Sequence, residues 1–107
     1  MLPTHRQPTS PGEMLLEEFL RPRGITQVEL AAKMGVPVQR VNTLINGKRG
    51  VSAETALLLA DVLNTTAEFW LGLQVDFDLW RARQRHRRRP ALRYASNHRK
   101  ARARTAA

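Results

Sequence analysis

The chain has 107 residues and contains no cysteine. This length fits one small domain with tails, and the composition excludes disulfides and zinc–thiolate sites. No apolar run approaches the roughly 18 residues of a membrane span, and the first residues lack the apolar stretch of a signal peptide. We therefore expect a cytoplasmic protein that does not enter a membrane.

The net charge of +9 is unevenly distributed along the chain. The residues before Arg81 contain seven Lys and Arg against nine Asp and Glu, which gives a net charge of −2. From Arg81 onward there are eleven Lys and Arg and no acid. The basic character therefore belongs to the C-terminal end, and the rest of the chain is slightly acidic.

An N-terminal arm and a first helix are predicted at the start of the chain. Residues 1–9 contain two prolines and no apolar periodicity, which is typical of an arm. Ser10 is expected to cap a helix that has Pro11 in its first turn and Glu13 completing a capping box. The segment 21–24 should break this helix. Its buried face would consist of Leu15, Leu16, Phe19 and Leu20.

Two short helices joined by a tight turn are predicted next. The first begins with the capping box formed by Thr26 and Glu29, and it ends at Gly35, which can adopt a left-handed conformation. The second begins at Pro37 and stops at residues 46–47. Because its outer face is polar, the pair is typical of a helix-turn-helix DNA reader.

Two further helices are predicted after a basic loop. Ser52 is expected to cap the fourth helix, and Thr66 the fifth, which would end at Trp80. The fifth helix is apolar on more than one side, so it must be buried on more than one side. In so small a protein the second side is expected to contact another copy of the chain. We therefore predict a homodimer with an interface that includes Leu73, Phe77, Leu79 and Trp80.

Polar residues of the helix that begins at Pro37 are candidates for reading DNA base edges. Glutamine and asparagine suit adenine, and arginine suits guanine. The candidates are Gln39, Arg40, Asn42 and Thr43. Neighbouring helical positions diverge by about 100°, so Gln39, Arg40 and Thr43 share one face best and Asn42 lies at its flank. The alternative for the whole set is an ordinary solvated helix face.

Residues at the ends of the two helices are predicted to contact DNA phosphates. Gln27 lies at a helix N-terminus, which favours an anion. Asn46, Lys48 and Arg49 lie in or beside the basic loop after the second helix, where a phosphate contact is expected. The Gly-Lys pair in this loop is not a P-loop, because the upstream glycine of that motif is missing.

The sequence contains no pattern that indicates catalysis or metal binding. The histidines at 5, 86 and 98 are scattered, so we expect no metal site. Asp76 and Asp78 would point away from each other on a helix, which argues against paired-carboxylate catalysis. We therefore expect neither an enzyme nor a bound cofactor.

Three motifs link the chain to a known family. They are Pro-Gly-Glu at 11–13, Asn-Gly-Lys-Arg at 46–49 and Glu-Phe-Trp-Leu at 68–71. With the sequence around them, residues 8–79 resemble HigA-type antitoxins of bacterial toxin–antitoxin modules, within the phage-repressor-like Xre group. The resemblance implies an all-α fold of five helices, here with a flexible basic C-terminal tail. It also implies a dimer that binds its own double-stranded operator DNA and a small RelE-like ribonuclease toxin, and it places Gln27 against a phosphate.

Alternatives remain open for the whole chain and for its tail. A stand-alone Xre-type regulator without a toxin and an RNA-binding protein that uses the arginines are the competing functions. We divide the chain into the arm 1–9, a DNA-binding and dimerisation domain 10–80 and an arginine-rich tail 81–107. The tail could be a solvated helix end, a nonspecific nucleic-acid arm or a segment that folds on an acidic partner. We favour the nucleic-acid arm.

Overall fold

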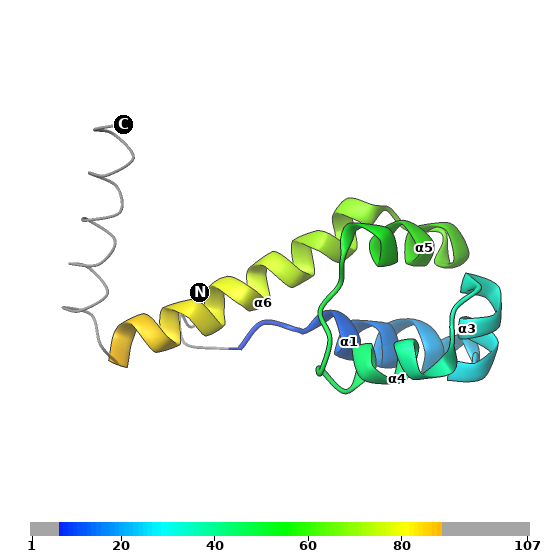
Figure 1. The fold of residues 1–107 in the computed structure, drawn as a ribbon, viewed down its shortest axis with the longest axis horizontal. Helices are drawn as coiled ribbons and strands as arrows, with labels where there is room; N and C mark the ends of the chain where they lie inside the picture. Colours follow the sequence, from blue (N-terminus) through cyan, green and yellow to red (C-terminus); the bar gives the residue numbers. More distant parts are fainter. Residues whose placement is uncertain (1–6, 89–107) are drawn as a thin grey trace. The chain divides into compact units, whose positions relative to one another are not determined.

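The computed structural model describes residues 7–88 (Figure 1). The expectations for residues 1–6 and 89–107, which include most of the predicted arm and tail, lie outside the described residues. The chain divides into two compact units, Met1–Phe77 and Asp78–Ala107.

The described residues form five helices and no strand, which confirms the predicted all-α fold class. The first helix is continuous but consists of three segments, namely α1 (Pro11–Met14), the π-helical η1 (Leu15–Leu20) and α2 (Arg21–Arg23). The others are α3 (Gln27–Met34), α4 (Val38–Ile45), α5 (Ala53–Leu63) and α6 (Ala67–Arg88).

The first helix continues through a proline that belongs to its predicted breaking segment. Pro22 lies inside α2, and the helix ends only at Gly24, which has a left-handed φ of 64°. A proline has no N–H, and in a regular α-helix its ring would clash with the carbonyl four residues earlier. The wider π turns of η1 come just before Pro22 and change that hydrogen-bond pattern, since Arg21 N–H donates to the carbonyl of Leu16.

Local capping interactions set most helix ends, as the sequence predicted. Thr26 Oγ1 accepts a hydrogen bond from Glu29 N–H at 3.1 Å, and the Glu29 carboxylate accepts one from Thr26 N–H at 3.0 Å. Ser52 and Thr66 cap α5 and α6 through their hydroxyl oxygens. Gly35 ends α3 with a φ of 72°. These boundaries follow from residues within one helical turn of each end.

Two further predicted helix boundaries were wrong. Pro37 is the N-cap of α4, with an extended ψ of 148°, and is not its first helical residue. More importantly, α6 does not end at Trp80 but continues to Arg88. Residues 81–88 are mostly arginine, alanine and glutamine, which favour a helix, and the next proline is Pro90. The arginine-rich stretch therefore begins inside a helix.

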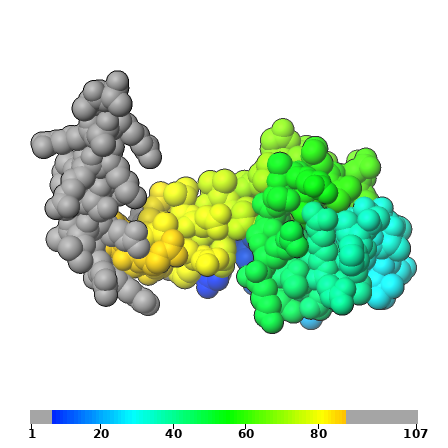
Figure 2. All heavy atoms as spheres, viewed as in Figure 1, coloured from blue at the N-terminus to red at the C-terminus, as the bar shows by residue number. Residues whose placement is uncertain are grey.

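The hydrophobic core of the first unit is centred on Trp70, which is fully buried. Its indole N–H donates a hydrogen bond of 2.7 Å to Thr65 Oγ1, so the polar atom of this side chain is satisfied. The rings of Phe19 and Phe69 lie 5.3 and 5.1 Å from the Trp70 ring. Other buried side chains from the surrounding helices are Leu15, Leu20, Leu30, Val41, Leu59 and Leu63. In Figure 2 the atoms of α3, α4 and α5 (cyan to green) form one continuous surface.

A glycine lets α1 approach the end of α4. α4 packs against α3 and also against α1. A Cβ atom at Gly12 would lie 2.8 Å from Ile45 Cα and even closer to the carbonyl oxygen of Leu44. Any side chain here would therefore push the two backbones apart. The position of α4, the predicted DNA-reading helix, thus depends on this close contact.

Candidate nucleic-acid interface

α3 and α4 form a helix-turn-helix unit with a polar outer face. The turn between them contains Gly35 and is closed by a 3.0 Å hydrogen bond from Val36 N–H to the Ala31 carbonyl. Val41 and Leu44 fix α4 to the core, while Gln39 and Asn42 are exposed. The outer face of α4 therefore presents two amide side chains on a helix that is anchored by its inner face.

A chain of hydrogen bonds joins three of the predicted DNA-contacting residues. Asn42 Nδ2 donates to Gln27 Oε1 at 3.3 Å, and Asn46 Nδ2 donates to Asn42 Oδ1 at 3.1 Å. The bonds connect the N-terminus of α3 with the middle and the C-terminal end of α4. The structure thus brings a predicted base reader, Asn42, together with two predicted phosphate contacts and restricts the orientation of all three.

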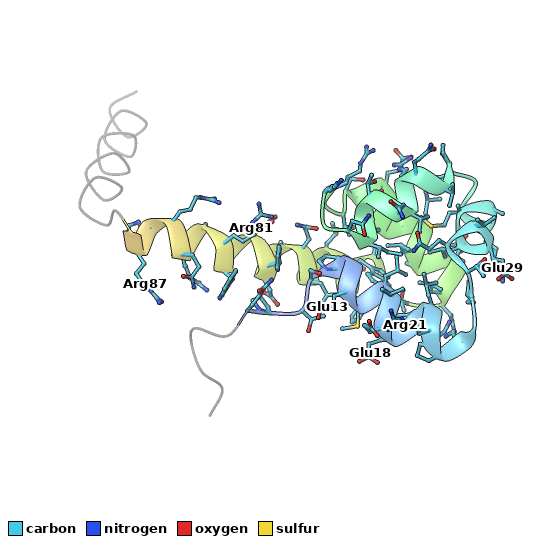
Figure 3. The ribbon with its side chains drawn as sticks, turned by 90° about the horizontal axis from the view of Figure 1, so that it is seen from below. Glu13, Glu18, Arg21, Glu29, Arg81 and Arg87 are labelled. Atoms are coloured by element: carbon cyan, nitrogen blue, oxygen red, sulfur yellow. The ribbon has the colours of Figure 1, made fainter. Side chains whose placement is uncertain are left out.

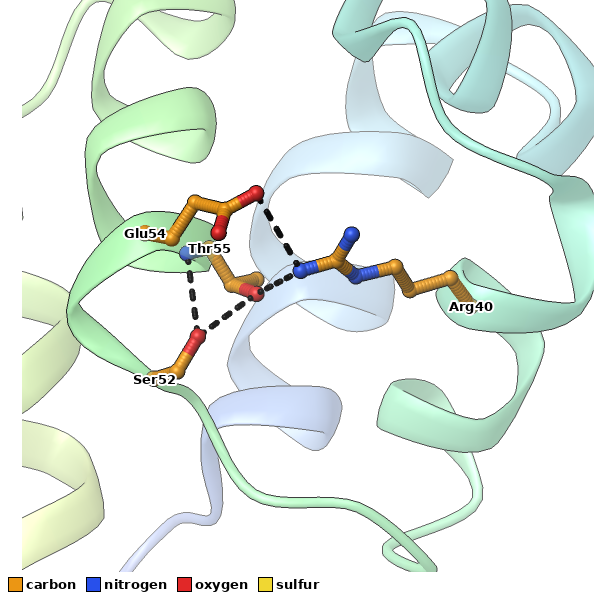
Figure 4. Close-up of polar contacts among 4 residues, drawn as sticks. All are labelled: Arg40, Ser52, Glu54 and Thr55. Carbon is orange, nitrogen blue, oxygen red and sulfur yellow. Dashed lines mark hydrogen bonds and ion pairs between the residues drawn. The ribbon is translucent and has the colours of Figure 1, made fainter.

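Arg40 points from α4 toward the N-terminus of α5 (Figure 4), whereas its neighbour Gln39 is exposed. Its Nη2 atom donates a hydrogen bond of 3.3 Å to Thr55 Oγ1 and lies 3.7 Å from Glu54 Oε1. The side chain is only 25% exposed, and its buried Nε has no hydrogen-bond partner. Ser52 completes the group, because its hydroxyl bonds to Thr55 Oγ1. Arg40 therefore links α4 to the N-terminus of α5 in this structure.

Thr43 is also partly satisfied within the protein. Its hydroxyl donates to the Arg40 carbonyl at 3.2 Å, and the side chain is half-buried. The Thr43 carbonyl accepts hydrogen bonds from the backbone N–H groups of Lys48 and Arg49, at 3.0 and 3.2 Å. These bonds fold the loop back onto the C-terminal end of α4. The side chains of Lys48 and Arg49 are exposed beside that helix end.

The ionisation of Glu29 is explained by its capping role. The hydrogen bond from the Thr26 backbone N–H, followed by the one with the Thr26 side chain, holds the pKa of Glu29 below its ordinary value of 4.5, and Lys33 contributes in the same direction. The carboxylate is solvent-exposed, as Figure 3 shows. Glu29 is therefore charged at neutral pH and serves the start of α3.

Metal-binding and membrane-spanning features are absent from the part of the chain that the structure describes. No group of three His, Asp or Glu side chains there is arranged to hold a metal ion. No helix between residues 7 and 88 is long and apolar enough to cross a membrane.

The apolar residues of α6 divide into packed and exposed groups. Leu73 is half-buried and packs against the core of the first unit, and Phe77 and Trp80 are also half-buried. Leu79 is 44% exposed, and Val75, which is not among the predicted interface residues, is 54% exposed. Of the four predicted interface residues, Leu79 is thus the most exposed.

Comparison with known proteins gives the family of the chain. A family model described as helix-turn-helix matches residues 16–70, which include α3 and α4. Antitoxin HigA-1 of Vibrio cholerae serotype O1 is 51% identical over 87 residues, which cover 80% of this chain and 81% of that protein. The chain belongs to the HigA-type helix-turn-helix family.

Other family members extend this relationship. An uncharacterized helix-turn-helix transcriptional regulator of Escherichia coli K12, YbaQ, is 45% identical over 75 residues, or 70% of this chain and 66% of that protein. A solved structure of antitoxin GraA in complex with its operator is 44% identical, with a TM-score of 0.71 over 80% of this chain and 87% of that one. These relatives are antitoxins and regulators rather than enzymes, in agreement with the expectation from the sequence.

The residues that sequence reasoning missed are those that act through another helix. The sequence indicates Glu54 only as an acid near the start of α5, and it predicts no role for Thr55. Both contact Arg40 across 14 or 15 positions of the chain. The only available signal was the presence of opposite charges on two helices, which does not identify a contact.

Proposed function

We propose that this chain is a sequence-specific DNA-binding antitoxin that represses its own operon. The observation that carries the proposal is the hydrogen-bonded group of Gln27, Asn42 and Asn46 across α3 and α4, which presents amides on an exposed helix face. It occurs in a chain that shares its fold with an antitoxin solved in complex with operator DNA. A protein with this function acts in the cytoplasm, where the chromosome lies.

We assign a role to each predicted contact from the position of its side chain. Gln39 and Asn42 are exposed amides that can pair with adenine in the major groove. Gln27, Asn46, Lys48 and Arg49 are suited to phosphates, because they lie at helix ends and in the loop. Arg40 and Thr43 were predicted to read bases. The Arg40 side chain instead favours a positioning role, because it holds α4 on α5, and the Thr43 hydroxyl already donates to the Arg40 carbonyl within α4.

Binding to the DNA upstream of the chain's own gene tests the assignment. Gln39→Ala should cost about 1–3 kcal/mol on this DNA and relax the preference at one base position. Lys48→Ala should weaken specific and random duplexes alike and lower the salt slope by about one unit. If Gln39→Ala weakens both duplexes equally, its role in base reading is wrong.

The protein is further proposed to act as a homodimer through α6. The exposed apolar residues Val75 and Leu79 are four positions apart, so they lie on one side of the helix. A two-fold dimer would place its two α4 helices about 34 Å apart on a symmetric site. Leu79→Glu should weaken dimerisation more than folding when measured by sedimentation. A wild-type monomer at micromolar concentration would contradict the dimer.

The antitoxin role requires a toxin, which we propose to be a small basic RelE-like ribonuclease. Exposed acids on the first helix, at Glu13 and Glu18, offer a docking surface for a basic protein (Figure 3). Glu17 lies beside them and is exposed, but its carboxylate is paired with Arg21 at 3.1 Å. The test is to co-express the product of the neighbouring gene and ask whether the two proteins co-purify. If that product is harmless when expressed alone, the stand-alone regulator takes the place of the antitoxin, as the likeness to YbaQ would allow.

A further inference from the structure

The C-terminal end of α6 is a strongly basic helix that the proposed function does not use. We call residues 81–88 the basic segment. It contains five arginines and no acid, and Arg81, Arg83, Arg85 and Arg87 are all exposed. Figure 3 shows Arg81 and Arg87 on this part of α6. The helix-turn-helix family match ends at residue 70, so the basic segment lies outside the matched range.

The density of charge in the basic segment is close to that of a nucleic-acid duplex. A helix rises about 1.5 Å per residue, so five arginines in eight residues correspond to roughly one positive charge per 2.4 Å. Duplex DNA carries about one negative charge per 1.7 Å. Six more Lys and Arg follow after Arg88, again without an acid. The charge is therefore sufficient to neutralise several consecutive phosphates.

The placement of the arginines around the helix also indicates the kind of partner. Residues four positions apart share a side of a helix, so Arg81 and Arg85 share one side and Arg83 and Arg87 lie on nearly the opposite side. A helix that is cationic on opposite sides suits a groove with phosphates on both walls. A single acidic patch on a protein could contact only one of the two sides. The geometry thus favours a duplex over an acidic protein.

The segment carries a cost that a polyanion would remove. Like charges four positions apart on a helix repel each other, which destabilises the helix. The favourable interaction of cations with a helix C-terminus reaches only the last turn. Bound phosphates would turn this repulsion into attraction and release the counterions that the duplex had condensed.

We propose that the basic segment is a second DNA-binding element, which contacts phosphates without reading the sequence. It increases the affinity for all duplexes and lowers the ratio of operator binding to random binding, because its contacts are independent of base identity. This inference does not depend on the proposed operator or toxin, since it concerns any duplex.

The test measures binding of the full-length chain to a random-sequence duplex at three salt concentrations. Arg83→Gln/Arg85→Gln removes two charges while keeping good helix formers, and Arg83→Lys/Arg85→Lys keeps the charges as a matched control. The glutamine variant should lower the salt slope by about 0.9 for each phosphate that is no longer neutralised, or about 1.8 per chain if both arginines bind. The lysine variant should keep the slope of the wild type. The lysine variant should unfold at the temperature of the wild type, and the glutamine variant at the same temperature or slightly above it, because it relieves the repulsion of two arginine pairs.

Three results would overturn the proposal. An unchanged salt slope in the glutamine variant means that the segment does not contact phosphates. An equal fall of the salt slope in the lysine variant, which keeps both charges, means that the slope does not report charge neutralisation by these two side chains. Tighter binding of the wild type to single-stranded RNA than to the duplex at every salt concentration would assign the segment to RNA. The protein could fail to bind its own operator and still show the predicted change in salt slope on the random duplex. That combination would reject the proposed function and support the role of the basic segment.

Discussion

Arg40 and the arginines of the basic segment carry the same charge in opposite kinds of environment. Arg40 is mostly buried, and its guanidinium contacts Thr55 and Glu54 of α5. Arg83 and Arg85 are exposed and lie among other arginines. The role of Arg40 depends on the side chains that its guanidinium contacts. The proposed role of the basic segment depends on how many positive charges it carries.

The difference shows that a net charge does not locate a DNA-binding surface. The segment before Arg81, which contains the helix-turn-helix unit, has a net charge of −2, and its proposed specificity comes from a few oriented amides. The proposed role of the basic segment depends on how many charges it carries and does not require a particular orientation of any one side chain. We expect the first region to respond to changes in geometry and the second to changes in charge and salt.

The largest effect should come from the contact that positions α4. Gly12→Ala places a methyl group against the backbone of α4 and should lower the free energy of unfolding by about 3 kcal/mol. Gly72→Ala is the matched control, because no atom lies within 4 Å of its Cβ position. It should raise the free energy of unfolding by about 0.5–1 kcal/mol. Urea unfolding measures both free-energy changes. If the two variants changed the unfolding free energy in the same direction, the close contact at Gly12 would not explain the effect.

A second, smaller effect compares the two kinds of arginine directly. Arg40→Ala removes a charge-assisted hydrogen bond and the ion pair with Glu54, so it should cost about 1–2 kcal/mol of unfolding free energy. Arg83→Ala should change it by no more than about 0.5 kcal/mol, because the residue is exposed. Urea unfolding of the two variants and the wild type measures both changes in unfolding free energy. Equal losses of stability for the two variants would show that the contrast between the regions is wrong.

The smallest effect should be a dependence on pH that is confined to the first region. Because the folded-state pKa of Glu29 lies below the ordinary value of 4.5, its stabilising contribution is complete above that value and is lost as the pH falls through the folded pKa. Arginine does not titrate in this range. Glu29→Gln keeps a polar capping group without a charge, so its melting temperature should fall less than that of the wild type between about pH 5 and pH 3. An identical fall in both proteins would contradict this.

The sequence predicted the features that depend on neighbouring residues. Ser52 and Thr66 cap helices because their hydroxyls need only reach an amide three positions on, and Gly35 ends α3 through its own backbone freedom. The exposed amides of α4 followed from its periodicity in the same way. These local signals indicated the number of helices and the helix-turn-helix unit.

The predictions that failed concern features that depend on distant residues or on competing sequence signals. The direction of the Arg40 side chain is set by Thr55, fifteen positions away, and no pattern in the sequence states that contact. The end of α6 was misplaced because the change from apolar to basic residues at Trp80 competes with helix propensity, which remains high until Pro90. The close approach of Gly12 to α4 likewise depends on tertiary packing.

The burial of Trp70 gives the protein two optical probes that report on different regions. Its indole is completely shielded from water and hydrogen-bonded to Thr65, whereas Trp80, next to Arg81, is partly exposed. An ionic quencher should therefore reduce the fluorescence of Trp80 and spare that of Trp70. Trp80→Phe would leave an emission that follows unfolding of the core alone, and Trp70→Phe would leave one that is sensitive to ligands of the basic segment.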